Sequence, residues 1–219
     1  MDIGKIIDDS FDYAKEGLVR KWKTWVLLII SCIIFPLYMG YTMRVYRGEK
    51  PAPQFDSWAS MFIDGIRLFL VGLIYALPVL ILCFVLFGST DIVRSSVNPG
   101  TITGLILVVF IGAIILVFLA ILTLLIFISA GVRFARTASF GEAFNFGAIL
   151  AHIGRIGWMT YIIALLMILI SLLNIVIICM VFNVAIPYSG SILLLLLLPF
   201  LGLASPRYIA LLYESAGTV

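Results

Sequence analysis

The sequence predicts an all-α, polytopic membrane helix bundle, and three observations support that prediction. Hydrophobic residues make up 63% of the chain, charged residues 11%, and the mean hydropathy is +1.23, whereas a soluble domain has about a quarter charged and just under half apolar residues. Long apolar runs fill most of the chain, and the basic residues gather in a few stretches beside them. We therefore expect residues 1–219 to form a single integral membrane domain with no separate soluble part.

The first stretch, residues 1–23, predicts an interfacial amphipathic helix. Ile3, Phe11 and Leu18 fall on one helical face, and acidic and basic residues lie mostly opposite, which is typical of a helix on the membrane surface. The stretch is rich in acids and is not followed by a small-residue cleavage site, so we expect it to be retained.

The first apolar segment, residues 24–43, is interrupted by Pro36 and Gly40 and forms either a re-entrant hairpin or a fifth span. A fifth span places the bases of residues 1–23 opposite the other basic stretches. A re-entrant segment places every basic residue except Arg94 on the cytoplasmic side, as the positive-inside rule requires. We favour the re-entrant form, which leaves both chain ends in the cytoplasm and requires its broken backbone to be buried in protein.

The remaining apolar runs predict four full spans, at residues 66–87, 101–129, 156–182 and 191–212. Two further interfacial amphipathic helices are expected at residues 54–66 and 140–155, and Asp56 or Ser57 is placed to cap the first of these. A polar loop over residues 88–100 joins the first two spans.

The last run contains two prolines and ends in a short polar tail. Pro199 and Pro206 predict a kink, since proline cannot donate to the helical ladder. Together with Arg207 they indicate that the chain leaves the membrane near residue 207.

The residues of the runs give no pattern for catalysis, cofactor binding or metal binding. Cys32, Cys83 and Cys179 lie inside apolar runs and are expected to be small buried hydrophobes. His152 lacks a second ligand at metal spacing. Asn174 is a candidate for a polar contact between helices. We expect no enzyme activity, no cofactor and no nucleic-acid partner.

The ends of the runs carry the one chemically distinctive group, a candidate rim for anionic headgroups. Its members are Arg44, Arg47, Asp64, Arg67, Arg133, Arg136 and Arg155. Arginine pairs well with phosphate, and basic residues beside spans attract anionic lipids. The alternative is that these arginines only orient the chain across the membrane.

Two segments resemble an uncharacterised family. The first carries Pro36, Gly40, Tyr41, Arg44, Val45, Arg47, Gly48, Pro53, Phe55, Asp56, Trp58, Phe62, Asp64 and Gly65, followed by VGLIYALP, and the second is RFARTASFGEAFNFGAIL. This pattern is similar to a family of archaeal and bacterial membrane proteins, the domain of unknown function numbered four thousand and thirteen. The resemblance implies a multi-pass membrane protein, often from methanogenic or related archaea, and implies no activity and no binding residues.

The expected function is that of a non-catalytic scaffold, assembly or accessory subunit in the cell membrane. Its partners would be membrane lipids and either another membrane protein or a second copy, because Gly104, Gly112 and Ala113 permit close helix contact. The alternative is a small permease or anionic-lipid-handling protein that uses the basic rim and the broken first segment.

Overall fold

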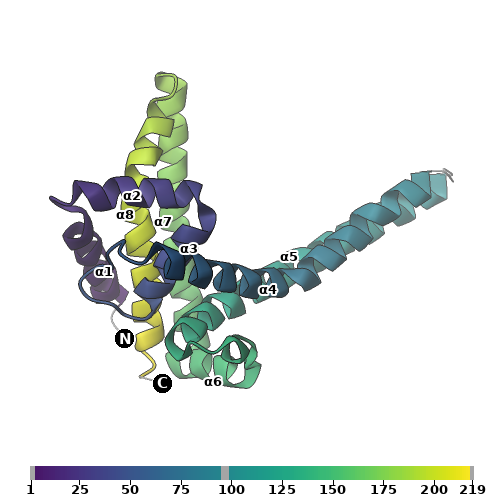
Figure 1. Ribbon diagram of the computed structural model, residues 1–219. Coiled ribbons are helices and arrows are strands. Elements are labelled where there is room, and N and C mark those ends of the chain that lie inside the picture. The colour runs from purple at the N-terminus through teal and green to yellow at the C-terminus, as the bar shows by residue number, and fades with distance from the viewer. Residues whose placement is uncertain (1–2, 95–98, 218–219) are drawn as a thin grey trace. The chain divides into compact units, whose positions relative to one another are not determined.

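The structure, a computed structural model, describes residues 3–94 and 99–217. In chain order the elements are α1 (Ile3–Leu18), α2 (Trp22–Ile33), α3 (Phe35–Tyr46), α4 (Trp58–Arg94), α5 (Pro99–Thr137), the 3-10 helix η1 (Phe140–Phe144), α6 (Phe146–Ile156), α7 (Trp158–Ala185) and α8 (Ser189–Glu214). Figure 1 shows these helices, and no strand occurs within the described ranges. The predicted all-α class is confirmed.

Among the described residues, four helices are long and apolar enough to cross a membrane. They are Trp58–Leu86, Ile106–Thr137, Trp158–Ala185 and Ser189–Glu214. They correspond to the predicted spans and confirm a polytopic helical membrane fold with four spans. Several of these helices extend beyond the predicted ends of the spans.

The second predicted interfacial helix, residues 54–66, is not a separate element. α4 begins at Trp58 and runs unbroken through the predicted span to Arg94, with Pro78 inside it. The charged residues Asp64 and Arg67 suggested an interfacial segment. Both lie instead within one continuous helix, where each side chain has an ionic partner. The predicted polar loop over 88–100 is also shorter, since α5 starts at Pro99; its residues 95–98 lie outside the described ranges.

The third predicted interfacial helix, residues 140–155, consists of two elements. η1 ends at Phe144, and Asn145 separates it from α6. The Asn145 side chain accepts a hydrogen bond of 3.2 Å from the backbone N–H of Ala148, so it caps α6 by satisfying an amide of the first turn.

The first apolar segment is broken into two helices of 12 residues each, α2 and α3. Each is about 18 Å long, well short of the roughly 30 Å hydrocarbon core. The break falls at Ile34 (φ −93°, ψ 78°), two residues earlier than Pro36, because the proline at the second position of α3 cannot donate to the end of α2.

The backbone at this break keeps its hydrogen bonds. The N–H of Ile34 donates to the carbonyl of Ile30 at 3.0 Å, and the Ile34 carbonyl accepts from Leu37 at 2.8 Å. These bonds reduce the desolvation cost that a broken helix meets in lipid. They favour the re-entrant form over a straight fifth span, and the choice between the two stays a prediction.

The chain divides into two compact units. The main unit comprises Met1–Phe69 and Ser129–Val219, and the hairpin unit comprises Leu70–Ile128. A single membrane domain over residues 1–219 stays a prediction.

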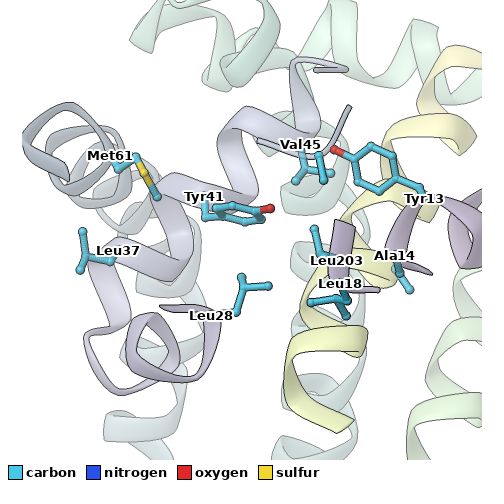
Figure 2. Close-up of a cluster of buried hydrophobic side chains, with 11 residues drawn as sticks. Tyr13, Ala14, Leu18, Leu28, Leu37, Tyr41, Val45, Met61 and Leu203 are labelled. Atoms are coloured by element: carbon cyan, nitrogen blue, oxygen red, sulfur yellow. The ribbon is translucent and has the colours of Figure 1, made fainter. Parts of the chain in front are cut away.

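The main unit is built around α8. Figure 1 shows α1, α2 and α3 gathered around this helix, and α7 packs along it. The buried cluster in Figure 2 joins α1, α2, α3, the start of α4 and α8 through Tyr13, Leu28, Tyr41, Met61 and Leu203. The apolar face of α1 is therefore partly covered by protein, although α1 was expected to lie on the membrane surface.

Two glycines let α3 and α4 approach backbone to backbone. A Cβ on Gly40 would lie 1.8 Å from the carbonyl oxygen of Met61, and a Cβ on Gly65 would lie 1.7 Å from that of Pro36. No side chain fits at either position. This crossing holds the rim residues of α3 and α4 next to each other.

The hairpin unit consists of the parts of α4 and α5 between residues 70 and 128. Near its start the rings of Tyr75 and Phe127 lie 5.8 Å apart. Farther along, a Cβ on Gly112 would lie 2.3 Å from a methyl carbon of Leu86. The two helices therefore run antiparallel in contact, and Phe84, at 79%, is among their exposed apolar side chains.

Candidate functional site

Arg44, at the end of α3, binds the segment that leads into α4. Its Nη1 donates to a carboxylate oxygen of Asp56 at 2.7 Å and to the backbone carbonyl of Gln54 at 2.9 Å. The hydrogen bond from Arg44 lowers the pKa of the Asp56 carboxyl. Asp56 thus serves as the ionic partner of Arg44.

Asp64 in α4 is shared by two arginines. Nη2 of Arg47 lies 2.7 Å from Oδ2 of Asp64, and Nη1 of Arg67 lies 3.6 Å from Oδ1. Arg47 also donates from Nε to the carbonyl of Ala135 at 3.1 Å. Arg47 therefore ties the end of α3 to both α4 and α5.

Arg133 in α5 forms an ion pair with Glu142 of η1. Its Nε donates to Oε2 of Glu142 at 2.8 Å, and its Nη2 donates to the same oxygen. This hydrogen bonding lowers the pKa of the Glu142 carboxyl. The pair fixes the turn after α5.

Arg136, one turn farther along α5, contacts the end of α8. Its Nη2 donates to Oε1 of Glu214 at 2.7 Å, and its Nε donates to the carbonyl of Tyr46 at 3.1 Å. The guanidinium also lies over the Tyr213 ring, 5.3 Å from its centre. Arg136 thereby joins α3, α5 and α8.

His152 of α6 is buried against α8, and Arg155 binds it. The His152 ring stacks on Tyr213 at 3.7 Å, its Nε2 lies 2.9 Å from the Tyr213 carbonyl, and Nη2 of Arg155 lies 3.1 Å from Nδ1. Because a guanidinium only donates, Nδ1 accepts and Nε2 carries the proton. Burial lowers the pKa of His152, in keeping with this neutral form.

The seven predicted rim residues therefore lie in the main unit, each with a protein partner. Their contacts connect α3, α4, α5, η1, α6 and α8 at the ends of the spans. Sequence reasoning missed Glu214, whose partner is 78 positions away, although it is the last acid in the chain. The structure gives the rim arginines a tethering role, and headgroup binding by the rim stays a prediction.

Asn174 lies on an exposed face of α7. Its Nδ2 donates to the carbonyl of Ile170 at 2.8 Å, one turn back in the same helix. This bond satisfies the amide within α7. The predicted contact with another helix stays a prediction for an assembly with a further chain.

Arg207 is the exception among the arginines because its side chain is buried within the chain, and the exit from the membrane near residue 207 stays a prediction. α8 continues for about two more turns to Glu214, and the Arg207 side chain is only 2% exposed. Its guanidinium carbon lies 5.2 Å from the centre of the Tyr13 ring, and Nη1 lies 4.0 Å from Oε1 of Glu214. Nε and Nη1 are buried without a hydrogen-bond partner among the described residues.

Among the described residues, one carboxylate lies within ion-pair distance of Arg207, that of Glu214. Burial raises the pKa of Tyr13 to about 12, so its phenol stays neutral, and its hydroxyl donates to the Glu49 carbonyl at 3.0 Å. Glu214 lies closer to Arg136 than to Arg207. A charge inside an apolar run was the sequence signal for this site, since residue 207 falls within the predicted span 191–212.

Metal chemistry has little support from the described side chains. Within residues 3–94 and 99–217, no group of three or more His, Cys, Asp and Glu residues is arranged to hold a metal ion. Cys32, Cys83 and Cys179 are free thiols. The distinctive polar features are therefore the tethered rim and Arg207.

These helices and their apolar faces define a polytopic α-helical membrane protein. A family model described as "Protein of unknown function (DUF4013)" matches residues 24–187. The chain belongs to this family. No curated protein and no solved structure gives a significant match to the chain.

Proposed function

We propose that the protein is a non-catalytic membrane scaffold or accessory subunit that binds a partner membrane protein through its hairpin unit. The observation behind this proposal is the contrast in burial between helices. Buried residues make up 39% of the most apolar stretch of Ser189–Glu214 and only 6% of that of Ile106–Thr137. The latter helix leaves its apolar surface for lipid or for another protein.

The composition of this surface supports a protein partner. The exposed side chains of the hairpin unit include the aromatic rings of Phe84, Phe110 and Phe118, and phenylalanine is one of the aromatic residues enriched in protein–protein interfaces. The main unit meanwhile stabilises itself through its buried cluster and ion pairs. One part of the chain thus holds its own fold, and the other offers an apolar helix pair.

Co-purification from native membranes tests the proposal. The full chain and a Phe110→Ala/Phe118→Ala variant are isolated in mild detergent, beside a Met159→Ala/Val181→Ala variant that alters exposed apolar residues of α7. We expect one stoichiometric partner, identified by mass spectrometry, with the full chain and the α7 variant, and its loss with the hairpin variant. A chain that purifies only with lipid, or a partner retained by all three proteins, contradicts the proposal.

In the proposed orientation the protein lies in the cell membrane, and both ends of the chain are on the cytoplasmic side. The distribution of basic residues supports it, and so does the break at Ile34. Reporters at residue 1 and within residues 95–99 distinguish the threadings. Two reporters on opposite sides of the membrane support the re-entrant first segment, and two reporters on the same side contradict it.

The alternative, a protein that handles anionic lipid, is favoured by one specific observation. Arg207 is a buried guanidinium with unbonded N–H groups, and ionisable residues within membrane spans often mark ligand pathways.

A further inference from the structure

We propose that Arg207 forms a buried binding site for a phosphate group. This site is separate from the rim arginines and does not depend on the scaffold role, which concerns the hairpin unit. Arg207 lies in the main unit, between Tyr13 of α1 and Glu214 at the end of α8.

The guanidinium of Arg207 has hydrogen-bond donors that the described residues do not satisfy. Nε and Nη1 of Arg207 are both buried and unbonded. Leaving a charged donor buried without an acceptor costs more than leaving a neutral one. The rim shows the contrast, because Arg47 and Arg136 each donate to a carboxylate and to a backbone carbonyl.

The charges next to Arg207 also favour an anionic ligand. Arg136 and Arg207 share one carboxylate, Glu214, which is 2.7 Å from Arg136 and 4.0 Å from Arg207. The neutral Tyr13 ring offers only its face to the cation. Arg136, Arg207 and Glu214 together therefore carry one positive charge in excess. An anion that accepts a hydrogen bond from Nε or Nη1 of Arg207 would compensate this charge.

Access and the chemistry of arginine indicate the class of ligand. The Glu214 side chain is 34% exposed at the end of α8, whereas Arg207 is 2% exposed, so a phosphate reaches the guanidinium when the side chains that cover it move aside. Arg207 lies about 10 Å along the helix from that end, a depth near the border of the headgroup region when this end of α8 meets the membrane surface. Arginine matches phosphate oxygens with several donors at once, and the phosphate comes either from a lipid headgroup or from a soluble ion.

Thermal unfolding of the full chain in micelles of dodecyl maltoside, a detergent without phosphate, tests the site. One arm adds inorganic phosphate to these micelles, and the other adds phosphatidylglycerol without inorganic phosphate. Arg207→Met is compared with the wild type and with Arg67→Met, which removes the same charge from the exposed rim. At a ligand concentration about 100 times Kd, binding raises the folded-to-unfolded ratio about 100-fold.

We expect a higher Tm for the wild type and for Arg67→Met in at least one arm, and no shift for Arg207→Met. A shift with inorganic phosphate identifies a soluble ion as a sufficient ligand, and a shift with phosphatidylglycerol alone identifies the headgroup. A wild type that does not respond in either arm overturns the proposal. An equal response of Arg207→Met overturns it as well.

A second measurement covers the case in which Arg207→Met does not fold. Arg207→Lys keeps the charge and loses the guanidinium, so we expect weaker binding of radiolabelled phosphate in equilibrium dialysis, or less phosphatidylglycerol retained in native mass spectrometry. Binding equal to that of the wild type in both measurements contradicts the proposal.

Discussion

In the main unit, a cluster of apolar side chains packs inward around residues such as Tyr41 and Leu203, although α7 exposes others such as Val181, whereas the apolar side chains of the hairpin unit are largely exposed, as at Phe110 and Phe118. The main unit also holds the rim ion pairs and the glycine crossing of α3 and α4. The difference shows where each part obtains its stability. The main unit draws on contacts within the chain, and the hairpin unit depends more on what surrounds it.

The largest expected effect comes from the glycine crossing. Gly40→Leu introduces a side chain where even a Cβ would lie 1.8 Å from the Met61 carbonyl oxygen, so α3 and α4 must separate. We expect a loss of about 3 kcal/mol or more in the free energy of unfolding, measured by thermal unfolding in detergent. Gly104→Leu in the hairpin unit is the control, because nothing lies within 4 Å of a Cβ there, and it should change stability by less than about 1 kcal/mol. Equal losses would remove the distinction between the two units.

A smaller effect is expected from Glu214→Gln, which removes the carboxylate between Arg136 and Arg207. Breaking a fully buried ion pair costs about 3–5 kcal/mol, and partial exposure reduces our expectation to about 2 kcal/mol. Asp12→Asn, which breaks the exposed pair with Lys15, should cost less than about 0.5 kcal/mol. If both variants unfold alike, the tether at the end of α8 contributes no more than a surface pair. Adding Arg207→Met to Glu214→Gln should recover part of the loss, because it removes one uncompensated charge.

The pH dependence of unfolding should locate a sensitive group in the main unit. Burial lowers the pKa of His152 in the folded chain below its ordinary value of 6.5. Between these two values the unfolded chain binds more protons, so stability is fully present above pH 6.5 and declines as the pH falls below it. Melting curves from pH 7.5 to pH 5 should show this decline for the wild type and a weaker one for His152→Gln. Identical curves for the two proteins would contradict the role of the neutral imidazole.

The smallest stability effect is expected in the hairpin unit. Phe118 is 68% exposed, so Phe118→Ala should change the free energy of unfolding in detergent by less than about 0.5 kcal/mol. In native membranes the same variant should lose much of its bound partner. A large loss of stability in detergent would mean that the ring is packed within the chain.

The sequence predicted the elements better than their contacts. Hydropathy located the four spans because a membrane span must be long and apolar. The Asp64–Arg67 pair is a local contact, since residues three apart are neighbours on a helix. The Arg136–Glu214 pair joins residues 78 positions apart, and no local periodicity brings such residues together.

The position of a break and the burial of a charge were harder to predict. Pro36 and Gly40 both marked the first apolar segment, yet the break falls at Ile34, while Gly40 serves as a contact point for Met61. Arg207 was interpreted as the exit of the chain because a charge usually ends an apolar run. Only the packing of Tyr13 and the end of α8 around it shows that this arginine is buried.

Site-specific photo-crosslinking in native membranes shows whether the exposed face of the hairpin unit meets a protein partner. A photoreactive residue replaces Phe118 in one protein and the exposed Val181 of α7 in another. We expect one discrete protein adduct from position 118, competed by excess unlabelled wild-type chain, and mainly lipid adducts from position 181. Lipid adducts alone from both positions, or the same protein adduct from both, would contradict this expectation.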